Sequence, residues 1–94
     1  MRPVAPWHVA AIHLAPGGVL GAHPAASDQL LLVASGNGSF VGEERVWHEA
    51  VPGRAAYWSP GEEHETRAGD EGLLAIVIEG EGLGEAIVLA PWED

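Results

Sequence analysis

The chain has 94 residues, which is enough for one domain built round a single hydrophobic core. It contains no cysteine, so disulfides, thiolate metal sites and cysteine nucleophiles are excluded. Four arginines and no lysine stand against 14 acidic residues, and the net charge of −10 argues against nucleic acid and anionic membranes as partners. No apolar run reaches the roughly 20 residues that span a bilayer, and the N-terminus lacks a signal-peptide pattern. We therefore expect a cytoplasmic protein.

Thirteen glycines and seven prolines punctuate the whole chain. They divide it into short segments that are often β-branched or aromatic, and no segment shows a helical period longer than two turns. Turns at such spacing are typical of an all-β sandwich or barrel. No composition shift suggests a linker, so we expect a single domain over residues 1–94.

The first half of the chain predicts strands over residues 7–15, 19–23 and 28–35. The third of these is apolar at nearly every position, with Gln29, Leu31 and Val33 on one face by period two. Both faces of this strand need cover, either by a second sheet or by a second copy of the chain. The GNG at residues 36–38 then predicts a tight turn.

The remaining strands are predicted over residues 39–42, 44–51, 54–58, 63–68, 73–79 and 85–90. The segment 63–68 alternates, so that His64 faces inward while Glu65 and Arg67 face water. We interpret the neighbouring pair Glu62 and Glu63 as a solvated turn.

Two stretches resemble the signature motifs of the cupin superfamily. The first motif, G-x5-H-x-H-x3-E-x6-G, is matched at about residues 17–36 by Gly17, His23, Ala25, Gln29 and Gly36. The second motif, G-x5-P-x-G-x2-H-x3-N, is matched at about residues 53–68 by Gly53, Ser59, Gly61, His64 and Ala68. The resemblance implies a cupin-type antiparallel β-barrel, also called a jelly roll or double-stranded β-helix.

The resemblance also implies a divalent metal ion, such as Zn, Ni, Mn or Fe, inside the barrel. His23 and His64 occupy two ligand positions of the family, and Gln29 occupies the position of its glutamate ligand. Ala25 stands where the family has a second histidine and cannot bind a metal. The site is therefore reduced to two imidazoles and a neutral amide, which lowers the expected affinity for transition metals.

Four other residues are candidates for a ligand pocket: Trp58, Tyr57, His48 and His13. Trp58 precedes His64 by one strand, and Tyr57 lies on the opposite face of the same strand. His13 and His48 could add a further metal ligand if their strand faces allow it. The competing interpretation is that each histidine is an ordinary structural residue bonded to a backbone carbonyl, and that the tryptophans belong to the core or to a dimer interface.

The sequence predicts a small cupin of undetermined activity that binds a divalent metal through His23, Gln29 and His64. The main alternative is a metal-free module that binds or senses a small molecule, and the third is a small isomerase or a dioxygenase-like enzyme. The apolar strand, the short chain and the habit of the family predict a homodimer.

Overall fold

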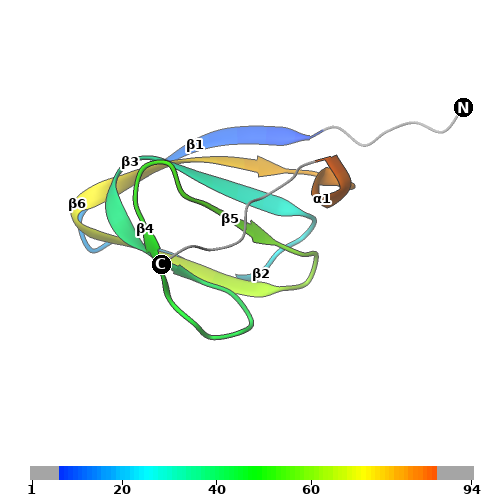
Figure 1. Ribbon diagram of the computed structural model, residues 1–94, viewed down its shortest axis with the longest axis horizontal. Helices are drawn as coiled ribbons and strands as arrows, with labels where there is room; N and C mark the ends of the chain where they lie inside the picture. The colour runs from blue at the N-terminus through cyan, green and yellow to red at the C-terminus, as the bar shows by residue number, and fades with distance from the viewer. Residues whose placement is uncertain (1–6, 87–94) are drawn as a thin grey trace, which may run out of the picture.

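The computed structural model describes residues 7–86, which form six β-strands and one short helix (Figure 1). These elements are β1 (His8–Leu14), β2 (Val19–Pro24), β3 (Gln29–Val41), β4 (His48–Ala50), β5 (Ala55–Trp58), β6 (Glu63–Glu79) and α1 (Leu83–Ala86). All the strand pairs are antiparallel. The all-β prediction is confirmed. The start of the strand predicted over 85–90 belongs instead to α1, and residues 87–90 lie outside the described range.

Two long strands, β3 and β6, organise the sheet. The C-terminal half of β6 pairs with β1 and with the first part of β3, while its N-terminal half pairs with β2 and with the last part of β3. The strand β5 pairs with the first part of β3, and β4 pairs with its last part. Both long strands curve sharply at the left of Figure 1, which folds the sheet over on itself. Among the described residues the order β1-β6-β3-β4 leaves the sheet open rather than hydrogen-bonded into a closed barrel.

Glycines allow the two long strands to bend together. A Cβ at Gly36 would overlap the carbonyl oxygen of Gly72, and both glycines have a positive φ, 87° and 74°. Between them, the side chain of Asn37 donates to Asp70 Oδ1 at 2.9 Å and accepts from the amide of Glu71 at 3.0 Å. The register shifts on both sides of this bend, as at a β-bulge.

This geometry corrects the prediction of a tight turn at residues 36–38. The GNG lies inside one continuous strand, β3, because Gly36 can approach the backbone at Gly72 of β6 closely and the ladder continues past the bend. For the same reason the two strands predicted over 63–68 and 73–79 are a single strand, β6.

The core lies between the two halves of the folded sheet. Leu31 and Val33 of β3 are buried in it, as period two predicts. In the ladder with β6, Leu31 is paired with Val77 and Val33 with Ala75. The largest completely buried side chain is Phe40. It meets the indole of Trp58 edge to face, with ring centroids 6.2 Å apart and an interplanar angle of 84°.

The opposite, outward face of the half-sheet formed by β1, β6 and β3 is also apolar. It presents Val9, Leu32 and Ile76, of which Val9 is 68% exposed and Leu32 is 36% exposed. Within residues 7–86 there is no helix of the length and hydropathy that crossing a membrane requires.

The bend makes a prediction about two glycines that share a positive φ. Gly36→Ala is expected to destabilise the fold by at least about 2 kcal/mol, because the new methyl group adds a clash with β6 to the strain of the backbone. Gly53→Ala, at φ 91° with nothing within 4 Å, is expected to cost only about 1 kcal/mol. Urea unfolding of both variants measures the difference, and equal losses would contradict the role given to the close contact.

Candidate functional site

His64 is the buried polar group at the centre of the candidate site. It lies near the start of β6, is 4% exposed, and faces the core with Thr66. Its Nδ1 is 3.2 Å from the carbonyl oxygen of Glu62. Because a carbonyl only accepts, Nδ1 carries the proton in this contact, and Nε2 is the ring nitrogen that can accept a hydrogen bond or bind a metal.

The imidazole of His64 stacks on the indole of Trp58. The ring centroids are 4.3 Å apart and the interplanar angle is 19°. Trp58 ends β5 and is 3% exposed, so it belongs to the core as well as to the site. A stacked neighbour covers the face of the imidazole but leaves the nitrogens in the ring plane accessible from the side. Trp58 therefore fixes the orientation of His64 without occupying its bonding directions.

Gln29 lies at the start of β3, directly opposite Trp58 on β5 and opposite Glu79 on β6. Its Nε2 donates a hydrogen bond of 2.6 Å to Glu79 Oε1. This bond fixes the orientation of the amide, so Oε1 of Gln29 is the atom left to accept a hydrogen bond or bind a metal. The carboxylate of Glu79 places a negative charge directly behind that amide.

The backbone of His23 lies opposite that of His64 in the β2–β6 ladder. The register shifts between Gly21 and His23, where a Cβ at position 21 would come within 2.7 Å of the carbonyl oxygen of His64. The side chain of His23 lies outside the described part of the structure. Ala25, at the place of the family's second histidine, is buried, and its amide donates to the carbonyl of Glu62 at 2.9 Å.

The register therefore brings the three predicted metal positions together round Trp58. Gln29 faces Trp58, Trp58 stacks on His64, and His64 is paired with His23. Among the side chains that the structure describes, no three histidines or carboxylates converge as a ready-made metal cluster.

The other predicted pocket residues lie elsewhere. His13 is exposed on β1 and is paired with Leu74, so it lies on the outward face. His48, half-buried on the short strand β4, has its Nε2 3.6 Å from Glu44 Oε1. Tyr57 faces away from Trp58 along β5 and interacts with the buried Asp28, which also accepts a hydrogen bond of 2.8 Å from the amide of Gly84.

Two site residues are missing from the sequence interpretation. Glu79 ends a strongly apolar strand, and period two with Ala75 and Val77 would have placed it on the inner face. Glu62 is more than a solvated turn residue, because its carboxylate accepts hydrogen bonds from the amides of Ser59 at 3.0 Å and Glu43 at 3.2 Å. It thus joins the loop that precedes β6 to the loop that follows β3.

Comparison with solved structures identifies the fold. A DMSP lyase, DddQ, from Ruegeria pomeroyi DSS-3 superposes with a TM-score of 0.74 at 19% identity, over 82% of this chain and 39% of its own. A cupin-like protein from Thermotoga maritima gives 0.74 at 21% identity, over 80% and 57%. A Cupin 2 conserved barrel domain protein from Salinispora arenicola CNS-205 gives 0.73 at 20% identity, over 86% and 68%.

The chain adopts the cupin fold. This confirms the fold that the two motifs predict. This chain spans 39% of the lyase and 57% of the Thermotoga protein, so the match covers only part of those chains. Searches with family profiles and among curated proteins found no match.

Tyr57 is expected to make the stability of the fold depend on pH in the alkaline range. Burial raises the pKa of its phenol above the ordinary value of 10.0, and the hydrogen bond to Asp28 and the charge of that carboxylate raise it further. Above about pH 10 the unfolded chain loses this proton while the folded chain keeps it, so stability falls as the pH rises through the folded pKa.

We expect Tyr57→Phe to remove this contribution. The unfolding free energy of the native chain should fall more steeply above pH 10 than that of the variant, as measured by urea unfolding at a series of pH values. Parallel curves for the two proteins would show that the phenol does not carry the effect.

Proposed function

We propose that this chain is a single-domain cupin that binds a divalent metal ion, Zn, Ni, Mn or Fe, through His23, Gln29 and His64. The observation that supports this most strongly is the bond from Nδ1 of His64 to the carbonyl of Glu62. Histidines that ligate metals usually donate their second ring N–H to a carbonyl or carboxylate, which fixes the tautomer and turns the other nitrogen towards the metal.

The pair formed by Gln29 and Glu79 supports the same proposal. An amide is a weaker ligand than the glutamate of the family motif, because it brings no charge to neutralise the metal. The carboxylate of Glu79, bonded to that amide at 2.6 Å, returns a negative charge to the same corner of the site. It also holds the amide so that its oxygen, rather than its nitrogen, is available to the metal.

A metal bound there would supply a Lewis acid that can polarise a small polar substrate. Trp58 keeps the imidazole of His64 oriented and, with Phe40, closes the core side of the site to water. The solved relatives include a DMSP lyase, which is consistent with a small-molecule substrate for this chain too. The reaction itself is undetermined, and the cytoplasmic location stays a prediction.

Metal analysis of three proteins tests this proposal. We expect untagged native chain to bind near-stoichiometric metal after incubation with Zn, Ni, Mn or anaerobic Fe(II), and His64→Ala to bind none. His13→Ala is the matched control and should bind as the native chain does, because His13 lies on the outward face. Glu79→Gln should lose about 10- to 100-fold in affinity, as expected for a residue that orients a ligand.

Absence of metal from the native chain would contradict the proposal and favour the metal-free small-molecule module. Equal metal in the native and His64→Ala proteins would also contradict it. Circular dichroism of His64→Ala checks that a loss of metal does not come from a loss of fold.

We propose further that two copies of the chain associate through the apolar outward face of β1, β6 and β3. The face presents Val9, Leu32 and Ile76, and the neighbouring outward residues Ala11 and Ile78 are also uncharged. In a chain with a net charge of −10, an uncharged face lets two identical copies meet without strong like-charge repulsion. The same patch on both copies suits a two-fold interface.

Sedimentation equilibrium at micromolar concentrations tests the dimer. The native chain should sediment as a dimer, and the double variant Val9→Glu, Leu32→Glu should sediment as a folded monomer. Val19→Glu, at a valine on β2 that is 53% exposed, should remain dimeric. A monomeric native chain would overturn this interface.

A further inference from the structure

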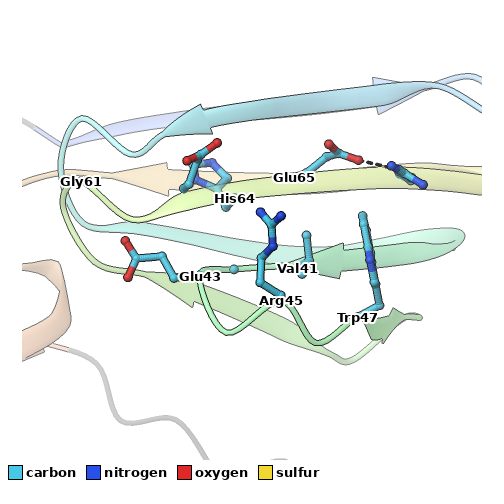
Figure 2. Close-up of a pocket in the computed structure, with 10 residues that line it drawn as sticks. Val41, Glu43, Arg45, Trp47, Gly61, His64 and Glu65 are labelled. Atoms are coloured by element: carbon cyan, nitrogen blue, oxygen red, sulfur yellow. Dashed lines mark hydrogen bonds and ion pairs between the residues drawn. The ribbon is translucent and has the colours of Figure 1, made fainter.

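A second polar site lies on the outside of the cupin domain. A groove of about 390 Å³ separates the loop of residues 42–47, which follows β3, from the N-terminal part of β6 (Figure 2). From β6 it is lined by Glu63, Glu65 and Arg67, which alternate along the strand with buried residues and so lie on the outward face. Of the described residues assigned above to the interior site, His64 alone borders this groove.

Arg45 projects from the loop into this groove, towards β6, as Figure 2 shows. It is the one residue other than glycine with a positive φ, 61°, in the part of the chain that the structure describes. An L-residue with a long side chain is disfavoured in this conformation, which glycine adopts easily. No side chain that the structure describes pairs with its guanidinium; among these residues only its backbone amide is bonded, to the carbonyl of Gly42 at 3.1 Å. Folding alone therefore does not account for an arginine at this position.

Arg67 on the β6 side of the groove already has partners. Arg67 is paired with Glu65, and its guanidinium lies 4.6 Å from the centroid of the Trp47 ring. Trp47 stands beside Arg45 on the same loop and is still 44% exposed. The groove thus has an aromatic ring in contact with Arg67, next to a guanidinium that no described side chain pairs with. Arg45 and Arg67, two of the four arginines of a strongly acidic chain, both line this groove.

Two carboxylates complete the lining. Glu43 on the loop and Glu63 on β6 both border the groove, and neither side chain is paired with Arg45 or with any other described residue. Groups of opposite charge that share a groove without pairing leave room for a ligand that satisfies both. A guanidinium prefers a carboxylate, which it can bind through two parallel hydrogen bonds, and carboxylates accept from hydroxyl or ammonium groups.

We propose that this groove binds a small carboxylic acid that also carries hydroxyl or ammonium groups. Arg45 holds the carboxylate, Glu43 and Glu63 accept from the donors, and the carbon skeleton packs against Trp47. Hydroxy acids and amino acids share this chemistry. The acid is held by Arg45, Glu43 and Glu63 rather than by the proposed metal ligands, although His64 borders both sites.

Calorimetric titration with four probes tests the chemistry at low salt. D-gluconate represents the hydroxy acids and L-serine the amino acids, while acetate offers a carboxylate alone and D-glucose offers hydroxyls alone. At least one of the first two should bind at least about tenfold more tightly than both acetate and glucose. If neither gluconate nor serine exceeds acetate and glucose, the proposal is wrong. Which of the two binds better decides between the two classes of acid.

Arg45→Gly separates a binding role from a structural one. Glycine suits the positive φ, so the variant should melt at a higher temperature than the native chain while losing at least about tenfold in affinity for the bound probe. Arg54→Ala, which removes an arginine outside the groove lining, should keep the native affinity. Unchanged affinity in Arg45→Gly, or a lower melting temperature, would overturn the proposal.

Discussion

The close approach of β3 and β6 at their common bend is the contact on which the rest of the molecule depends. Gly36 and Gly72 meet there with no room for a side chain, and the side chain of Asn37 ties the bend in β6. Straight strands of this length would form one flat sheet with two exposed faces. Because both strands bend at the same place, the sheet folds over. Phe40 and Leu73 are then buried in one hydrophobic core between its two inner faces. The hydrophobic core is thus a consequence of a backbone contact.

The same fold encloses a few polar side chains, and among the described residues no fully buried side-chain nitrogen or oxygen lacks a hydrogen-bond partner. Nδ1 of His64 is bonded to the carbonyl of Glu62, and the amide of Gln29 is bonded to the carboxylate of Glu79. An unpaired polar group in such a place would cost several kcal/mol, by the roughly 2–7 kcal/mol estimated for a buried amide. The stacking of Trp58 on His64 places one polar group within the aromatic core. The interior therefore contains polar side chains whose orientation is fixed by hydrogen bonds, as a metal or ligand site requires.

Much of this could be predicted from the sequence, because the alternation of side chains in a strand is a local property. Period two places Leu31 and Val33 in the core and turns His64 inward, and the cupin motifs predict that His64 and Gln29 belong to one site. The bend could not be predicted, because GNG by itself favours a tight turn, and only the close approach of Gly72 on β6 makes Gly36 part of a bent strand. The conformation of Arg45 could not be predicted either, since a positive φ is disfavoured for an arginine.

We propose that Nε2 of His64 binds a divalent metal inside the folded sheet. An anomalous difference map from crystals grown with Zn²⁺ tests it most directly. We expect a single strong peak in the interior, about 2.0–2.1 Å from Nε2 of His64, with Gln29 and His23 turned towards it. An interior without a peak, in crystals whose surface sites do hold zinc, would contradict the account and leave the site beside Trp58 as a polar element of the core.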